Sequence, residues 1–416
     1  MKKISLLNRF TILFPLALVL FEFTVYIAND MIQPAMPAVV QEFGVSSAWI
    51  PTALTAFLIG GGTLTWLLGP LSDRYGRRPV MLAGSVLFAL SCVAILFSSS
   101  IENFIMLRVF QGMGMCFIGA VGYAAIQEAF EEAAAIKVMA LMANVSLIAP
   151  LVGPFLGALL ISIAPWRIIF VLIGLLAVGC VWGLWRHMPE TVDAQAQAEA
   201  IHQDHFVIRL LKEYKRILTQ GSFVRAALVP PLLALPILGW IGVGPLVLMS
   251  HFNLTPLAFS MWQIPVFTCL IAGNLILAKV TGRWALDKTL KIGLILIAVA
   301  AVIALFGGIF LSNAYLPLVI ATSLTALGEG LSFSVYYRFA LTASTAPKGL
   351  AAAAVNLFFT VVFAAGVELY KIMFLQAGLF GYALLTALLA ILVCFLARIS
   401  IAEALTLRQT AEDKIA

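Results

Sequence analysis

Charged residues are scarce in this sequence. Only 11% of its 416 residues are Asp, Glu, Lys or Arg, whereas 62% are hydrophobic, and the mean hydropathy is +1.06. A soluble protein of this length could not present a polar surface to water with so few charged side chains. The composition therefore excludes an ordinary soluble globular protein and favours one that is surrounded by lipid.

Paired cysteines, histidine clusters and phosphate-binding loops are also missing. The five cysteines lie singly in apolar segments without CxxC spacing, so neither a disulfide framework nor a metal site is predicted. Nothing resembles a GxxxxGK[ST] loop, so ATP is not expected to supply energy. We expect no enzyme and no cofactor. An ion gradient, or the gradient of the substrate itself, is the expected energy source.

The net charge of +6 does not indicate nucleic-acid binding. The Lys and Arg residues are scattered between apolar runs, as expected of residues that anchor loops at a membrane surface. We therefore expect membrane lipid, and not nucleic acid, as the partner of these basic residues.

What the sequence has is a series of long apolar runs. Each is close to the roughly 20 residues that a helix needs to cross a bilayer. The alternation of a barrel strand is absent, so an all-α membrane protein is expected. Twelve spans are predicted, at 11–33, 48–69, 79–98, 102–125, 138–162, 166–187, 223–249, 257–279, 289–311, 315–340, 350–375 and 379–398.

Basic residues give the direction of these spans. An even number of spans puts both termini on one side. The loops on that side hold nearly all Lys and Arg, from Lys2, Lys3 and Arg9 onward, whereas the other side has little beyond Arg167 and Lys371. Cytoplasmic loops carry the excess of Lys and Arg, so a multi-pass protein with both termini in the cytoplasm is predicted. The first run lacks a signal-peptide cleavage site and is read as a span.

One long loop divides the chain into two halves. We expect a six-helix half at 1–187, a cytoplasmic linker at 188–222, a second six-helix half at 223–400 and a cytoplasmic tail at 401–416. Two pseudo-symmetric halves of this kind place a substrate site between them and alternate its access by rocking.

The linker contains one segment with helical spacing of apolar residues. These residues are Val207, Leu210, Leu211, Tyr214 and Ile217, and basic residues separate them. A short amphipathic helix on the cytoplasmic membrane surface fits this pattern, and so does an ordinary solvated linker helix.

The loop between spans 2 and 3 reads GPLSDRYGRRP. Glycine and proline make this turn tight, and one acid among three arginines can hold the loop in one arrangement by pairing. The candidate gating residues here are Gly69, Asp73, Arg74, Gly76, Arg77 and Arg78. This string resembles the cytoplasmic motif of the major facilitator superfamily.

Two further motifs extend the resemblance. RVFQGMG in span 4, with Arg108, resembles the R-x-x-Q-G motif of that superfamily. APLVGPFLGA in span 5 is similar to the G-P-x-x-G motif of its drug/proton antiporters. Its candidate gating residues are Pro150, Gly153, Pro154 and Gly157. Small residues in span 5 also allow close helix packing, and both interpretations can hold together.

Longer strings are similar to the MdfA-type multidrug/proton antiporters of enteric bacteria. They are YIANDMIQP, WLLGPLSDRYGRRPVMLAG, CFIGAVGYAAIQE and ALMANVSLIAP, which contains Asn144. The resemblance implies the twelve-helix major facilitator fold and proton-coupled export of varied drugs. We also expect a functional monomer in a bacterial inner membrane. The chain departs from the family pattern at the AKVTGRWALD loop and at Glu329 in span 10.

Two acids lie in the first span, within FEFTVYIAND. An ionisable group in a span usually faces a cavity, pairs with another charge or carries protons. Asp30 follows Glu22 by eight residues, which is about 12 Å along a helix and roughly 80° around it. Tyr26 and Asn29 fall near the face of Glu22 and are candidate cavity residues.

Depth in the membrane suggests a partner for one acid but not for the other. Arg108 lies at a depth similar to that of Asp30, so we expect these two to pair, either as a proton-sensitive switch or as a static link between helices. No basic residue matches the depth of Glu22. Glu22 is therefore a candidate proton carrier that also attracts cationic drugs.

Other charged residues have local interpretations. Glu368 and Lys371 are three residues apart near the end of span 11, so a local pair is expected. Glu128 lies in an acidic cytoplasmic loop after span 4. The resemblance implies that it meets the basic loop between Arg74 and Arg78.

Together these observations favour a proton-coupled exporter of lipophilic cationic and neutral compounds that works by alternating access. Few polar side chains lie within the spans, whereas a nutrient importer needs several to hold a hydroxylated solute. A nutrient or metabolite transporter of the same fold remains an alternative, because fold does not fix function. A membrane receptor or sensor is a second alternative.

Overall fold

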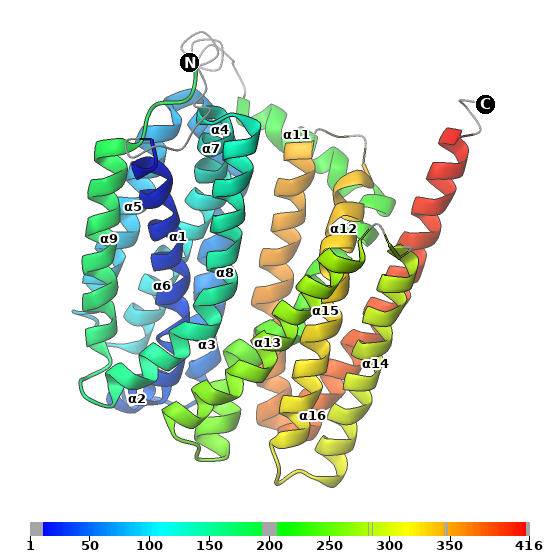
Figure 1. The fold of residues 1–416 in the computed structure, drawn as a ribbon. Helices are drawn as coiled ribbons and strands as arrows, with labels where there is room; N and C mark the ends of the chain where they lie inside the picture. Colours follow the sequence, from blue (N-terminus) through cyan, green and yellow to red (C-terminus); the bar gives the residue numbers. More distant parts are fainter. Residues whose placement is uncertain are drawn as a thin grey trace. The chain divides into compact units, whose positions relative to one another are not determined.

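The computed structural model describes residues 11–193, 206–281, 283–284, 286–344, 346 and 348–412. The described residues are almost entirely helical, in agreement with the predicted all-α fold (Figure 1). They fall into two compact units. The first unit comprises Met1–His205 and Pro245–Gln263, and the second comprises Phe206–Gly244 and Ile264–Ala416.

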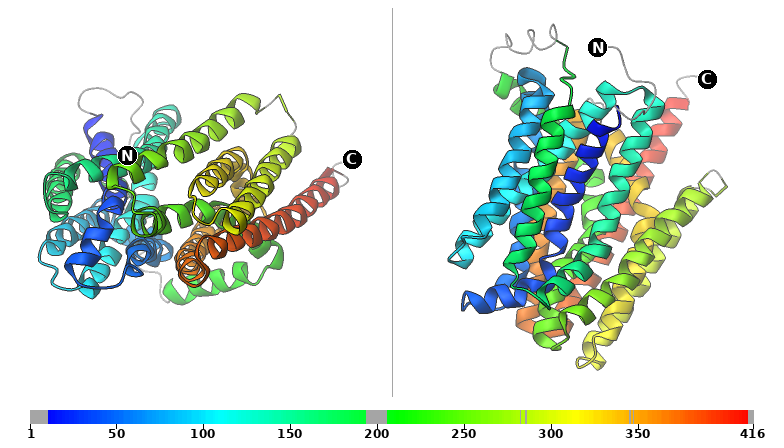
Figure 2. Two further views of the ribbon diagram at one scale, coloured as in Figure 1. Left: turned by 90° about the horizontal axis from the view of Figure 1, so that it is seen from below. Right: turned by 60° about the vertical axis from the view of Figure 1, so that its left-hand side comes forward.

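The first unit is a bundle of long helices with short helical segments at both ends (Figures 1 and 2). Its elements are α1 (Leu13–Asp30), η1 (Gln33–Ala35), α2 (Met36–Glu42), α3 (Trp49–Thr63), α4 (Thr65–Tyr75), α5 (Arg77–Ile95), α6 (Ile101–Phe117), η2 (Ile118–Gly122), α7 (Tyr123–Ala129), α8 (Glu132–Ile161), α9 (Arg167–His187) and η3 (Pro245–His251). The α4–α5 turn and α7 lie at the end of the bundle where α1 begins, and α2 lies at the opposite end.

The second unit has fewer and longer helices. They are α11 (Phe206–Leu218), α12 (Gly221–Gly244), α13 (Pro256–Val280), of which the first residues belong to the first unit, α14 (Leu286–Phe310), α15 (Leu316–Thr342) and α16 (Lys348–Glu412). Helix α12 packs against α15 and α16, and α14 packs against the same two helices.

The helices account for the twelve predicted spans. Ten described segments are long and apolar enough to cross a membrane, and α3 with α4, bent by 41°, forms an eleventh. One of the ten, Gly349–Ile399, has 51 residues, and it is broken at Ala377 and Gly378, where the φ angle of Gly378 is 58°. Because about 20 residues cross a bilayer, this segment supplies two spans. The break falls between the predicted spans 11 and 12.

Glycines set the closest helix contacts of the first unit. A Cβ atom on Gly112 of α6 would lie 1.9 Å from the carbonyl oxygen of Phe57 in α3, and one on Gly60 of α3 would lie 2.0 Å from that of Val109. A Cβ atom on Gly157 of α8 would lie 2.0 Å from the oxygen of Met31. Backbones this close leave no room for a side chain, which confirms the predicted close packing through span 5.

Apolar side chains cover much of the outer surface as well as the interior. Leu90, Phe97 and Trp182 of the first unit and Ile295 and Val302 of the second are all well exposed. A protein in water would not present so many large apolar side chains, whereas one in lipid gains no advantage by hiding them.

A polar cluster fastens the end of the first unit that holds α2. Arg167 pairs with Glu42 and donates hydrogen bonds to the backbone oxygens of Leu96, at 3.3 Å, and Ser98, at 3.0 Å. Trp166 donates from Nε1 to the second oxygen of Glu42, at 2.6 Å. The cluster joins α2, the α5–α6 loop and the start of α9.

The amphipathic segment of the linker is helical, as predicted. In α11 the side chains of Leu210, Tyr214 and Ile217 are buried, whereas Lys212 and Lys215 are exposed. The helix packs against α12 and α16. The polar part of the linker at 194–205, the N-terminal residues Lys2, Lys3 and Arg9, and the last four residues of the tail lie outside the described residues.

Candidate functional site

Glu22 is buried in the middle of α1, with 2% of its surface exposed. Its Oε1 atom accepts a hydrogen bond from the hydroxyl of Tyr123 at 3.2 Å, whereas its buried Oε2 atom has no hydrogen-bond partner among the described residues. Tyr26 is half-buried on the same helix and lies within electrostatic reach of both Glu22 and Asp30. The site thus holds one carboxyl oxygen that no protein donor satisfies.

Tyr123 was not among the residues predicted from sequence. It follows η2, a π-helical segment that interrupts the helix between α6 and α7. Such π segments shift the phase of a helix and occur often at functional sites. The glycines in CFIGAVGYAAIQE are the only sequence signal for this break.

Arg108 is fully buried in α6, with 0% of its surface exposed. Its guanidinium group donates to Oδ1 of Asn29 at 2.7 Å and to Oε1 of Gln111 at 2.7 Å. Gln111 in turn donates to the sulfur of Cys92 at 3.1 Å. The guanidinium carbon lies 4.7 Å from the ring centre of Phe57, a cation–π distance.

The predicted direct pair between Asp30 and Arg108 is wrong in this structure. Asn29 lies between them, since its Nδ2 atom donates to Oδ1 of Asp30 at 3.2 Å while its Oδ1 atom accepts from Arg108. Consecutive residues of a helix point about 100° apart, so only one of the two can face α6. Asp30 instead lies against α8, where a Cβ atom on Gly153 would be 2.6 Å from its Cβ atom.

An amide can make this bridge because it both accepts and donates hydrogen bonds. The three residues Asp30, Asn29 and Arg108, called the relay below, form one chain of polar contacts between α1 and α6. Asn29 was predicted as a cavity residue and is buried here. Asn144 on α8 is exposed, and its predicted role in the cavity remains a prediction.

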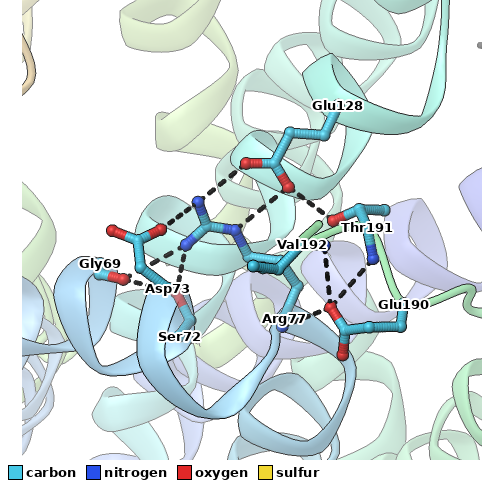
Figure 3. A network of polar contacts seen from close by, with 8 residues as sticks. All are labelled: Gly69, Ser72, Asp73, Arg77, Glu128, Glu190, Thr191 and Val192. Carbon is cyan, nitrogen blue, oxygen red and sulfur yellow. Dashed lines mark hydrogen bonds and ion pairs between the residues drawn. The ribbon is translucent and has the colours of Figure 1, made fainter. Parts of the chain in front are cut away.

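A second polar network surrounds the α4–α5 turn, at the end of the bundle where α1 begins (Figure 3). Arg77 pairs with Asp73 at 2.5 Å and with Glu128 at 2.8 Å, and its Nε atom donates to Glu128 at 3.2 Å. It also donates to the backbone oxygen of Gly69 at 3.2 Å and to the hydroxyl of Ser72. The expected contact of Glu128 with the basic loop is therefore confirmed, through Arg77.

The turn itself depends on Gly76. Its φ angle of 100° lies in the region that favours glycine, and it separates α4 from α5. The guanidinium of Arg78 donates to the backbone oxygen of Trp185 at 2.7 Å, and that of Arg74 lies 5.9 Å from the ring of Tyr75. Arg77 bridges Asp73 and Glu128.

Two residues of this network, Glu190 and Thr191, were not predicted. Glu190 accepts from the backbone nitrogens of Arg77 and Arg78, and Thr191 donates to Glu128. They follow α9 in the string MPET, where the only signal is an acid just after a predicted span.

Pro150 and Pro154 lie inside α8, which remains one helix from Glu132 to Ile161. The hydroxyl of Ser260, at the start of α13, donates to the backbone oxygen of Pro154 at 2.8 Å. In the second unit, Glu368 and Lys371 form the predicted local pair.

Glu329 lies buried on α15, and no described residue donates a hydrogen bond to its Oε2 atom. The glycines on both sides of it pack closely, since a Cβ atom on Gly328 would lie 2.7 Å from the oxygen of Gly293 in α14. The sequence departure at this position therefore puts an acid among tightly packed helices.

Comparisons with known proteins agree with this architecture. The family model described as Major Facilitator Superfamily matches residues 18–368. The chain is 46% identical over 378 residues to the multidrug transporter MdfA of Yersinia pestis bv. Antiqua, covering 91% of each chain. It is 45% identical over 378 residues to the chloramphenicol resistance protein CraA of Acinetobacter baumannii, covering 91% of this chain and 90% of CraA.

Solved structures share the fold at low sequence identity. A bacterial homolog of the human lysosomal transporter Spinster matches with a TM-score of 0.72 and 11% identity, over 96% of this chain and 97% of that one. The xylose transporter XylE from E. coli matches with a TM-score of 0.70 and 14% identity, over 92% and 97%. With the family model and the relatives at 45–46% identity, these matches show that the chain belongs to the major facilitator superfamily and, within it, to the MdfA-type multidrug transporters.

Proposed function

We propose that the protein exports lipophilic cations and neutral drugs across a bacterial inner membrane in exchange for protons. Relatives at 45–46% identity carry the names multidrug transporter and chloramphenicol resistance protein, which supports drugs as the substrate class. The observation that carries the proposal is the buried carboxyl group of Glu22, whose Oε2 atom receives no hydrogen bond from the part of the chain that the structure describes.

Glu22 binds either a proton or the positive charge of a drug. A lone carboxylate in an apolar interior is strongly disfavoured, so one of the two must neutralise it. Tyr123 holds one oxygen at 3.2 Å and leaves the other available. Competition between a proton and a cation for one oxygen is the simplest basis for exchange.

The relay couples protonation to conformation. When Asp30 is ionised, the amide of Asn29 is polarised between an anion and the cation of Arg108, and it holds α1 to α6. A proton on Asp30 removes the anion and weakens both hydrogen bonds, because bonds to charged groups are the stronger ones. The two states of the relay then favour different arrangements of these helices.

The network of Asp73, Arg77 and Glu128, called the gate below, stabilises one arrangement of the α4–α5 turn. Both termini lie in the cytoplasm under the charge rule, so the gate lies on the cytoplasmic side. Its contacts are ionic, and its two acids are partly exposed whereas Arg77 is buried, so water can replace the partners of the acids when the contacts break during alternating access.

We further propose that the transporter acts as a monomer and needs no cofactor beyond the proton gradient. Helix α11 is proposed to lie at the cytoplasmic membrane surface. Its exposed lysines, Lys212 and Lys215, and its exposed leucine, Leu211, suit the boundary between headgroups and acyl chains.

Proton release by the purified protein tests the proposed exchange. Adding tetraphenylphosphonium, a permanent cation, to unbuffered detergent-solubilised protein should release protons, and Glu22→Gln should abolish the release. Vesicles containing the protein should then move the cation against its gradient when a pH gradient is imposed. Proton release without movement would indicate a receptor, and movement of a sugar or amino acid instead of the drug would indicate a nutrient transporter.

A further inference from the structure

We infer that Glu190 and Thr191, called the latch below, are positioning residues that hold the gate in its closed arrangement. The inference rests on the proposed role of the gate. It adds two residues that contact neither the relay nor Glu22, and it assigns a function to the segment after α9.

Glu190 caps the beginning of α5. Its carboxylate accepts the backbone N–H groups of Arg77 at 2.8 Å, Thr191 at 2.9 Å and Val192 at 3.1 Å (Figure 3). It also accepts that of Arg78 at 3.2 Å. The first N–H groups of a helix have no partner within it, and the residue before α5, Gly76, has no side chain to supply one. An anion at this position also interacts favourably with the helix dipole.

Thr191 acts on the other partner of the gate. Its hydroxyl donates to Oε2 of Glu128 at 2.5 Å, and the same oxygen accepts from Nε of Arg77 at 3.2 Å. The remaining oxygen of Glu128 accepts from Nη2 of Arg77 at 2.8 Å. Thr191 thus orients the carboxylate for a two-bond contact with Arg77.

The latch therefore holds both sides of one ion pair. Glu190 fixes Arg77 through its backbone, and Thr191 fixes Glu128 through its carboxylate. Figure 3 shows Glu190 and Thr191 on the segment that follows α9, with Glu190 in contact with Arg77 and Thr191 in contact with Glu128.

The turn between α4 and α5 is shaped to receive Glu190. A Cβ atom on Gly76 would lie 2.4 Å from Oε2 of Glu190, so any other residue at position 76 would collide with the carboxylate. Gly76 therefore provides the φ angle of 100° and also leaves room for the carboxylate.

The place of the latch in the chain gives it a function. Glu190 and Thr191 lie at the start of the linker predicted at 188–222, just after α9 ends at His187. Release of the latch removes the cap from α5 and one donor from Glu128, which frees the gate to open.

Hydrogen exchange of the backbone amides tests the latch directly, without requiring transport. In the full-length protein, Glu190→Ala should speed exchange at the amides of Arg77 and Arg78 by on the order of tenfold, the loss expected for hydrogen bonds to a charged acceptor. The matched control is Glu131→Gln, which alters an exposed acid whose side chain caps no backbone N–H. Equal exchange in the two variants would refute the latch.

Export and binding then separate positioning from general damage. Thr191→Val keeps the shape of the side chain and removes its donor, so it should slow tetraphenylphosphonium export several-fold while leaving the Kd of that cation unchanged. Thr191→Ser should restore the rate. Unchanged export in Thr191→Val, or a slow Thr191→Ser, would overturn the inference.

A double-mutant cycle tests whether Glu190 and Thr191 act together on the gate. Because both residues act on one ion pair, the double variant Glu190→Gln with Thr191→Val should slow export less than the product of the single effects. Independent effects would show that the two residues do not form one device. If the wild-type protein fails to exchange drug for protons, the proposed function fails, whereas the exchange of amides at Arg77 and Arg78 still decides the latch.

Discussion

The guanidinium group of Arg108 donates to the amide oxygen of Asn29 at 2.7 Å, and it meets Asp30 only through that amide. Because the amide of Asn29 lies between them, a proton on Asp30 affects the guanidinium of Arg108 only indirectly. The contact with Asn29 can weaken without leaving Arg108 bare, because Gln111 and the ring of Phe57 also face the guanidinium.

Asn29→Ala should uncouple the relay and destabilise the protein. The buried guanidinium would lose one acceptor, with an expected loss of about 1.5–3 kcal/mol in the free energy of unfolding. Thermal unfolding in detergent measures this loss, and the pH dependence of export should flatten.

The matched control for this variant is Thr24→Val on the same helix. The hydroxyl of Thr24 donates to the backbone oxygen of Leu20 and lies outside the relay. Its removal should cost about 0.5–1.5 kcal/mol and leave the pH profile intact. A pH profile altered equally by both variants would refute the relay.

Glu22→Gln should selectively abolish export of cations. The substitution keeps the volume of the side chain and removes the charge that offsets a cation in a poorly solvated site. Chloramphenicol is neutral and does not need the charge of Glu22, so its export should persist. Resistance and vesicle transport of both compounds give the measurement.

Asp30→Asn should impair export of both compounds, since the relay is needed whatever the charge of the drug. Identical substrate profiles in Asp30→Asn and Glu22→Gln would mean that either carboxyl serves both purposes.

Collapse of the membrane potential should slow export of neutral drugs and spare monovalent cations, if one proton enters per cycle. Exchange of one cation for one proton moves no net charge, so only the pH gradient drives it, at about 1.4 kcal/mol per unit. A neutral drug also draws on the potential, at roughly 2.3 kcal/mol per 100 mV. Vesicles treated with valinomycin and potassium provide the test, and equal inhibition of the two would indicate another stoichiometry.

Asp73→Asn should slow transport without weakening drug binding. The pair with Arg77 is half-exposed, at 53% for the Asp73 side chain, so its loss should change stability by no more than about 1 kcal/mol. Glu128→Gln should have the larger effect on rate, because Glu128 accepts two hydrogen bonds from Arg77. Loss of binding with an intact conformational cycle would contradict a gating role.

Gly112→Ala should destabilise the first unit strongly. Its new Cβ atom would lie 1.9 Å from the oxygen of Phe57, and overpacking of this kind costs about 1–3 kcal/mol or more. Gly179→Ala on α9 is the control, since no atom lies within 4 Å of the added Cβ atom. It should be neutral or stabilising by about 0.5–1 kcal/mol, as expected for glycine in a helix interior. Thermal unfolding of the two variants compares them.

The features that depend on composition along the chain could be predicted from the sequence. The apolar runs located the spans because a helix must satisfy its own backbone in lipid, and the GPLSDRYGRRP string located the turn that Arg77 stabilises. The local pair of Glu368 and Lys371 followed from helical spacing alone.

The features that the sequence did not predict depend on the rotation of side chains around a helix axis and on contacts with backbone atoms far away in the sequence. Asp30 was predicted to pair with Arg108 because the two lie at a similar depth in the membrane. The position of each side chain around the axis of α1, however, makes Asn29 face α6. Tyr123 reaches Glu22 only because a π-helical segment shifts the helix before it. Glu190 binds backbone nitrogens of a turn more than a hundred residues earlier, and no pattern of side chains records that partner.

The glycine contacts between α3 and α6 have a practical consequence for spectroscopy. Backbones this close at Gly60 and Gly112 would collide if the helices slid past each other, so we expect α3 and α6 to move as one body during transport. A pair of spin labels on the exposed faces of α3 and α6 would therefore report a constant separation. That separation can calibrate distances measured to labels elsewhere in the chain, and it serves as an internal reference for conformational change.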